Sequence, residues 1–157
     1  MDSYSQAAVE FAPLFDGLWL DEAVQEQFDA TLINDVVVVL DAQLALPVRG
    51  HQLGAWMLSE VSDRMLSSHD GLVLARPIPD DIDPNTHAGR VATERLTQHW
   101  RSCGLVPVTD CQGFLAQASA YTALESARTA LDRIADRDIT LTADQMARWT
   151  KPFGSHD

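Results

Sequence analysis

A valine-rich run that leads into a glycine-bearing turn limits most strongly how this chain can fold. Residues 36–46 read Val-Val-Val-Val-Leu-Asp-Ala-Gln-Leu-Ala-Leu, a composition that favours a strand. Gly50 and Gly54 mark the turn that follows. An amphipathic helix is predicted after it, with Leu53, Met57, Val61 and Met65 on one buried stripe joined by Trp56. Together these patterns predict a strand–turn–helix unit.

The turn at residues 46–55 has the features of an anion-binding site. The first N–H groups of a helix have no partner within it and carry partial positive charge, so they can receive a phosphate. Arg49 is the first basic residue in the chain, and the nine charged residues before it are all acidic. A lone cation at a helix start is therefore predicted to contact an anionic ligand.

Length, cysteines and charge exclude several classes of protein. A chain of 157 residues predicts one domain, with a buried core. Cys103 and Cys111 make neither a disulfide framework nor a zinc site, and there is no signal-peptide pattern. No apolar run approaches the ~20 residues of a membrane span. We therefore expect a reduced cytoplasmic protein, and the net charge of −12 argues against nucleic acid or anionic membrane as a partner.

The acidic charge is concentrated at the N-terminal end. Residues 1–48 carry nine acids and no base, whereas residues 49–157 carry 14 acids and 11 bases. Such a segment is either a solvated acidic face or a surface that receives a cationic substrate or a basic partner.

The remaining patterns predict alternating helices and strands in one domain. Residues 1–33 form an acidic, helical N-terminal segment, residues 34–120 the core, and residues 121–157 C-terminal helices. Helices are expected over 4–16, 21–32, 88–103, 122–136 and 142–150, and strands over 71–75, 105–108 and 113–118, the last two as an antiparallel hairpin. The fold class is α/β, with a mixed sheet of the α+β kind and flanking helices.

The turn and the order of elements resemble the GNAT acyltransferase superfamily. Its acetyl-CoA loop usually reads Arg/Gln-x-x-Gly-x-Gly/Ala, and Arg49-Gly50-His51-Gln52-Leu53-Gly54 matches at Arg49 and Gly54. Gln52 replaces the middle glycine, whose backbone adopts positive φ without strain. The order strand, turn, helix, strand, helix, strand, strand over residues 34–120 is that of a GNAT domain from its fourth strand onward.

The resemblance implies a cofactor and a reaction. GNAT enzymes hold acetyl-CoA between two parallel strands, where a substrate amine attacks the thioester. The implied function is an N-acetyltransferase for an amine of unknown identity, with acetyl-CoA or coenzyme A as cofactor. The residues implied to bind the cofactor are Leu46, Val48, Arg49, Gly50, His51, Gln52, Leu53, Gly54 and Ala55.

The proton-transfer groups are less regular than the turn. The family often places a tyrosine acid four residues before a Gly-Phe-like pair; that pair is Gly104-Leu105 here, and the residue at the acid position is Trp100. We interpret Trp100 as core, which leaves His99 and Tyr121 as candidate acids. Asp41, on the valine-rich strand, is the candidate base. The spacing of the five histidines supports no metal site.

Three departures from the family leave an alternative open: Gln52 at a glycine position, Trp100 at the acid position, and a short segment before the core. The 33 residues before the core are too few for the early GNAT strands, so the sheet is reduced or a partner supplies strands. A non-catalytic GNAT-like protein that acts as a binding or regulatory partner is therefore the second reading. An unpaired edge on the valine-rich strand also predicts a homodimer or a basic protein partner.

Overall fold

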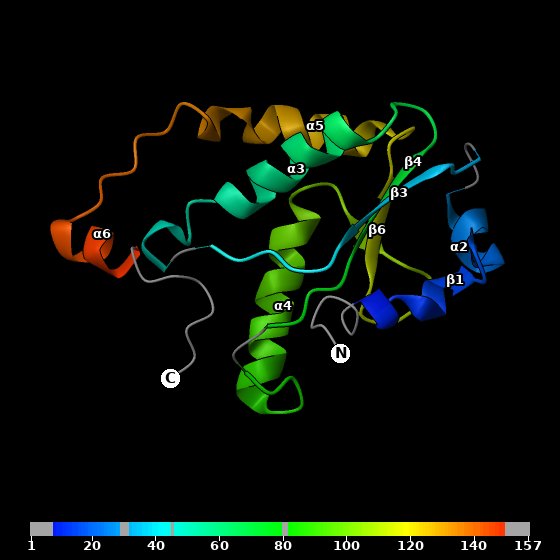
Figure 1. Cartoon of the computed structure of the whole chain (residues 1–157), viewed down its shortest axis with the longest axis horizontal. Coiled ribbons are helices and arrows are strands. Elements are labelled where there is room, and N and C mark those ends of the chain that lie inside the picture. Colours follow the sequence, from blue (N-terminus) through cyan, green and yellow to red (C-terminus); the bar gives the residue numbers. More distant parts are fainter. Residues whose placement is uncertain (1–7, 29–31, 45, 80–81, 150–157) are drawn as a thin grey trace.

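A four-stranded mixed sheet lies at the centre of the computed structural model, which describes residues 8–28, 32–44, 46–79 and 82–149. Its order is β3-β4-β6-β5, with β3 parallel to β4 and the other neighbours antiparallel (Figure 1). The strands are β3 (Asp35–Val39), β4 (Gly71–Ala75), β6 (Leu115–Ala118) and β5 (Val106–Pro107). The expected class, a mixed α/β sheet with flanking helices, is confirmed at this coarse level.

The valine-rich strand is shorter than predicted. β3 pairs with β4 from Asp35 opposite Gly71 to Val39 opposite Ala75, and residues 40–44 have no regular structure. β4 stops where Pro77 and Pro79 follow, because proline has no N–H to donate to a ladder. The prediction of a strand to Leu46 was therefore wrong, since β3 has no partner beyond Val39 within the described part of the sheet.

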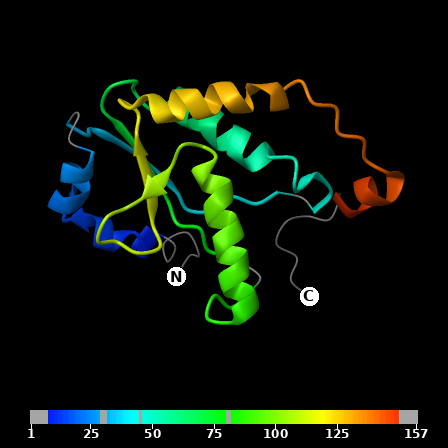
Figure 2. The ribbon, with the colours of Figure 1, turned by 180° about the vertical axis from the view of Figure 1, so that it is seen from behind.

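The two faces of the sheet are covered by different parts of the chain. Val73 and Ala75 of β4 pack into one cluster with residues of the helices α3 (Leu53–Met65), α4 (His87–Arg101) and α5 (Thr122–Leu131). Leu72 and Leu74 point to the other face and pack with residues of the N-terminal segment. The alternation along β4 thus builds a core on both sides of the sheet. Figure 2 shows α4 standing at an angle to α3 and α5.

The buried face of α3 differs from the predicted one. Ala55, Leu58, Ser59 and Ser62 are buried, whereas Met57, Val61 and Met65 are 50%, 41% and 65% exposed. Both serines can face the core because their hydroxyls donate to carbonyls of their own helix: Ser59 to Trp56 O at 2.7 Å and Ser62 to Leu58 O at 2.7 Å. The predicted stripe of Met57, Val61 and Met65 instead forms an apolar surface.

The N-terminal segment is only partly helical. A 3-10 turn, η1 (Ala12–Leu14), leads into a hairpin of β1 (Phe15–Asp16) and β2 (Trp19–Leu20), and α2 (Glu22–Gln27) follows. The helix predicted over 4–16 was therefore wrong at its C-terminal end; residues 1–7 and 29–31 lie outside the described part of the chain. β1 and β2 pair with each other, so within residues 8–28 and 32–34 no strand extends the main sheet.

The C-terminal helices form as expected in outline. α5 is followed by the 3-10 turn η3 (Asp132–Ile134), and α6 (Ala143–Trp149) contacts the 3-10 turn η2 (Leu46–Val48). The predicted capping box at α6 is present, because Thr142 N donates to Gln145 Oε1 at 2.8 Å and Gln145 N donates to Thr142 Oγ1 at 3.3 Å. Within the described residues, every helix is too short or too polar to cross a bilayer.

Candidate functional site

The start of α3 leaves its first N–H groups without a side-chain cap. The N-cap residue is Gln52, and its side chain makes no capping hydrogen bond. The first bond of the helix joins Trp56 N to Gln52 O at 3.0 Å, so the amides of Leu53, Gly54 and Ala55 precede the ladder. The amides of Leu53 and Gly54, at the positive end of a 13-residue helix, are thus available to an anion, whereas Ala55 is fully buried.

Two residues of the turn have positive φ. Gly50 has φ +83° and Gln52 has φ +61°, ψ +14°, in the left-handed region. Gly50 adopts this conformation without cost, whereas Gln52 pays a steric penalty. A glycine at position 52 would adopt the same backbone without strain, so Gln52 strains the turn.

Arg49 ties the turn to the segment that follows β3. Its Nε donates to Leu44 O at 2.8 Å, and the side chain is otherwise exposed. The Leu44 side chain reaches the first turn of α3, where its Cδ1 lies 3.5 Å from the position that a Cβ on Gly54 would take. Val48 is buried beneath the same turn. Arg49 and Leu44 therefore hold the loop closed beside the start of α3.

The structure brings His99 to the same place. His99 lies in the last turn of α4, and its Nε2 is 3.0 Å from the position that a Cβ on Gly54 would occupy. The two helices also meet where Cys103 Sγ donates to Ala55 O at 3.4 Å. A Cβ at position 54 would therefore force the imidazole to shift by a few tenths of an ångström.

Burial determines the protonation of His99 and Cys103. Desolvation lowers the pKa of His99 below its usual 6.5, so its imidazole is neutral at pH 7. The ring packs edge-on against Trp100, with centroids 5.0 Å apart. Desolvation also raises the pKa of Cys103 to about 12, which keeps this thiol protonated and unreactive. His99 is thus a neutral imidazole that lies beside the start of α3.

The other two catalytic candidates lie elsewhere. Asp41 follows the last residue of β3 by two positions, in an exposed segment without regular structure, so it does not project from the strand as predicted. Tyr121 lies beyond the end of β6, where Ser119 N donates to Gly71 O at the first residue of β4. Tyr121 thus lies at the end of the sheet where β3 and β4 begin, whereas the turn lies beyond the end where they stop. The length of the sheet separates the two.

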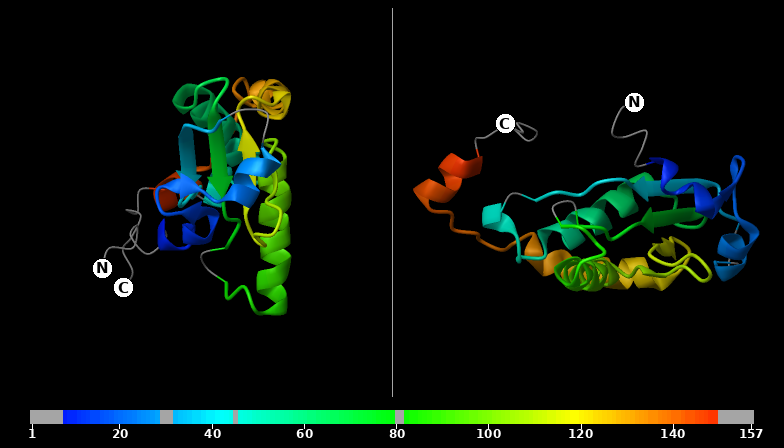
Figure 3. Two further views of the ribbon diagram at one scale, coloured as in Figure 1. Left: turned by 90° about the vertical axis from the view of Figure 1, so that its right-hand side faces the viewer. Right: turned by 90° about the horizontal axis from the view of Figure 1, so that it is seen from below.

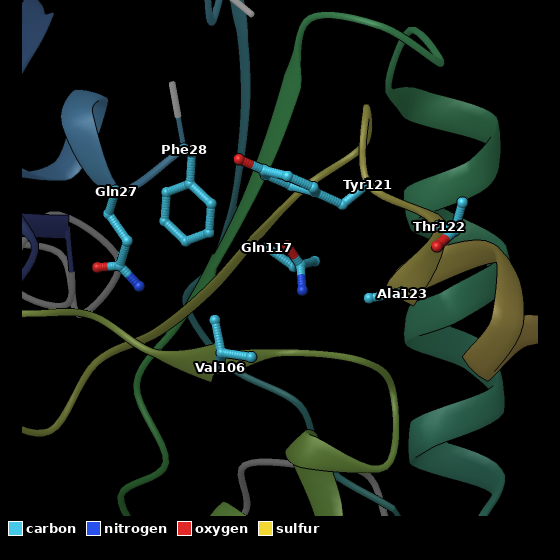
Figure 4. A pocket seen from close by; sticks show the side chains of 7 residues that line it. All are labelled: Gln27, Phe28, Val106, Gln117, Tyr121, Thr122 and Ala123. Carbon is cyan, nitrogen blue, oxygen red and sulfur yellow. The ribbon is translucent and has the colours of Figure 1, made fainter. Parts of the chain in front are cut away.

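Tyr121 lines an open pocket of about 340 Å³ (Figure 4). Tyr121 and Phe28 face each other edge-on, with centroids 6.4 Å apart. Two amides in the wall are already used: Gln27 Nε2 donates to Pro107 O at 2.9 Å, and Gln117 Nε2 donates to Gly104 O at 2.8 Å. The lining residues are Gln27, Phe28, Val106, Gln117, Tyr121, Thr122 and Ala123. None of them carries a charge, so the pocket offers an anion no ion pair.

Trp100 belongs to the core, as the sequence indicates. It is 6% exposed and packs with residues of α3, β4 and α5. An indole N–H does not serve as a general acid, so the position that carries a tyrosine acid in many GNAT enzymes has only a packing role here. Among the described residues, no three His, Cys, Asp or Glu side chains come together as a metal site would require.

Comparison of the chain with protein-family models, with curated proteins and with solved structures finds no match. The cofactor-binding residues predicted from the sequence lie together at the turn, except that the side chain of Leu46 is outside the described part. The contact of His99 with Gly54 and the role of Leu44 were not predicted. No local pattern links positions so far apart in the chain, and only an alignment of related sequences could have signalled them.

Proposed function

We propose that this chain binds acetyl-CoA in the manner of the GNAT superfamily and transfers the acetyl group to an amine. The observation that carries the proposal is the uncapped start of α3, reached through a left-handed turn after the parallel strand β3. The amides of Leu53 and Gly54 would bind the pyrophosphate, together with the guanidinium of Arg49. Backbone amides make these contacts, so the loss of a glycine at Gln52 is compatible with binding.

The strand arrangement supports the same ligand. In GNAT enzymes the acetyl-CoA arm enters between two parallel strands, and β3 and β4 are the parallel pair here. Their ladder ends at Val39 opposite Ala75, after which one chain runs toward the turn and the other into Pro77. The arm of the cofactor would enter where these two segments leave the ladder.

His99 would act as the base in the transfer. Acetylation requires that the ammonium of the substrate lose a proton before its nitrogen attacks the thioester carbon, and a neutral imidazole accepts that proton. The new C–N bond would form as the C–S bond breaks, coenzyme A would leave as the thiolate, and the second proton of the attacking nitrogen would pass to that thiolate or to water. The acidic residues before Arg49 would favour a cationic amine.

The alternative is a GNAT-like protein that binds coenzyme A without catalysis. It is favoured by the burial of Trp100, the exposed position of Asp41 and the distance of Tyr121 from the turn, because no acid lies beside the proposed site to protonate the thiolate. Both readings require the ligand at the start of α3. They differ only in whether thiol is released.

Calorimetric titration with acetyl-CoA, followed by a thiol-release assay with polyamine acceptors, tests both readings. We expect heat of binding at millimolar ligand and at least about tenfold weaker binding in Arg49→Ala, since a charge-assisted hydrogen bond contributes about 1.5–3 kcal/mol. Arg95→Ala, which removes an exposed arginine of α4, is the matched control and should bind like the wild type. Binding without thiol release selects the alternative, and absence of heat refutes the proposal.

A further inference from the structure

The outer edge of β3 is open. β3 is the first strand in the sheet order, and within the described residues its second edge pairs with no strand. The strand reads Asp-Val-Val-Val-Val, and its four valines are only half-buried. A flat, uncharged valine edge with free backbone groups pairs readily with another strand. This edge can therefore accept a strand from another chain.

An apolar surface lies on α3 above the same edge. On the flank of α3 that faces α5, Glu60 bonds Arg128 at 3.0 Å and Asp63 lies 3.4 Å from it. The exposed stripe of Met57, Val61 and Met65 lies roughly a third of a turn from that flank and from the buried face, by helix periodicity. Figure 3 (left) shows α3 above β3 and β4, with α5 on the β6 side. The stripe therefore faces outward over the edge of β3.

We propose that two copies of this chain form a two-fold dimer through the edges of β3, with the two α3 stripes packed against each other. Antiparallel pairing centred on Val37 places each valine opposite a valine or Asp35, and it keeps the two Asp35 residues at opposite ends. Centring on Val38 would set Asp35 against Asp41 of the other copy, and centring on Val36 would leave Val38 opposite Asn34. The Val37 register is thus the one the edge favours.

The second layer fits this symmetry. A two-fold axis that relates antiparallel strands of one sheet runs perpendicular to the sheet, so both copies of α3 lie on the same face. Strands are about 4.8 Å apart and packed helices 8–10 Å apart, so one helix covers about two strands. With α3 above β3 and β4, the next helix position across the edge belongs to α3 of the second copy. One stripe then covers the other.

Local charge permits the approach of an identical chain. The protein carries a net charge of −12, which opposes association in general. On α3, however, Glu60 and Asp63 are offset by Arg128 and Arg64, and Arg64 also bonds Glu60 at 3.5 Å. The charges on this flank therefore nearly cancel, and the adjoining stripe of Met57, Val61 and Met65 is apolar. A second copy satisfies the open edge and the stripe together.

Sedimentation equilibrium of Val61→Lys and Val91→Lys tests the dimer. Val61 in the stripe and Val91 on α4 are helical valines of almost equal exposure, 41% and 39%, so they are matched. The wild type and Val91→Lys should have twice the monomer mass of 17.3 kDa at tens of micromolar. Val61→Lys should raise the dissociation constant at least about a hundredfold, because two lysines oppose each other in an apolar contact. Met65→Lys should act likewise if Val61→Lys does not fold.

Hydrogen exchange tests whether the dimer forms through the edge of β3 or through another surface. Amides of residues 35–39 should exchange more slowly in the wild-type dimer than in monomeric Val61→Lys. A wild type that is monomeric at a hundred micromolar overturns the proposal. So does a dimer in which Val61→Lys and Val91→Lys behave alike, or one in which exchange in β3 is independent of concentration.

Discussion

Replacement of Gln52 by glycine should stabilise the protein. Gln52 holds φ +61° at the start of α3, where its side chain is exposed and makes no capping bond. The left-handed conformation costs a residue with a Cβ about 1–2 kcal/mol, and glycine avoids that cost. Glycine also gives the unfolded chain more conformational entropy, which favours unfolding and offsets about 0.4–1 kcal/mol of this stabilisation. The expected net effect is a stabilisation of about 0.5–1 kcal/mol.

Urea denaturation and thermal melting followed by circular dichroism measure this effect. For a chain of this size the melting temperature should rise by about 1–4 °C. Gln98→Gly is the matched control, because Gln98 lies inside α4, where glycine costs about 1 kcal/mol. Gln52→Ala should change stability little, since alanine keeps the Cβ. If Gln52→Gly destabilises the protein as Gln98→Gly does, Gln52 does not have the left-handed backbone conformation described above.

Three further predictions concern buried groups at and behind the site. Trp100→Ala should lower the free energy of unfolding by about 3–5 kcal/mol in urea titration, whereas Trp100→Tyr should remain folded; a stable Trp100→Ala would contradict its place in the core. The pKa of His99 is lower in the folded protein than in the unfolded chain, so His99 binds a proton more tightly in the unfolded chain. The free energy of unfolding should therefore decline as the pH falls below ~6.5. His99→Gln should remove that part of the decline. Parallel profiles of stability against pH for the wild type and His99→Gln would refute this prediction. Because its pKa is about 12, the buried Cys103 thiol should not react with an aromatic disulfide reagent at pH 8 until urea unfolds the protein, whereas half-buried Cys111 should react. Rapid reaction of the folded variant Cys111→Ser, in which Cys103 is the remaining thiol, would contradict this.

The sequence was a good guide where local patterns agree with tertiary packing. The strand over 71–75 and the hairpin around residues 109–112 are present because their apolar spacing matches the faces they bury. The buried stripe of α3 was placed on the wrong side, because sequence hydrophobicity ranks Met57 and Met65 above Ser59 and Ser62. Serines that bond their own helix can enter the core, and that exchange depends on the neighbouring elements.

Long-range pairing accounts for the remaining differences. β3 stops at Val39 because its partner β4 stops at Ala75, which the residues of β3 do not encode. The same holds for the site: the turn at Gly50–Gly54 follows from local residue types, whereas the approach of His99 depends on how α4 packs on α3. Local chemistry predicts the turn, and only the fold brings His99 to it.

Amide chemical shifts during a titration with coenzyme A test the central claim most directly. The start of α5 is an internal control, because its N-cap residue Tyr121 also makes no side-chain capping bond and lies at the opposite end of the sheet. We predict the largest shifts at the amides of Leu53 and Gly54, with Thr122 unchanged. Shifts of equal size at the start of α5, or none at the start of α3, would contradict binding of the cofactor at this turn.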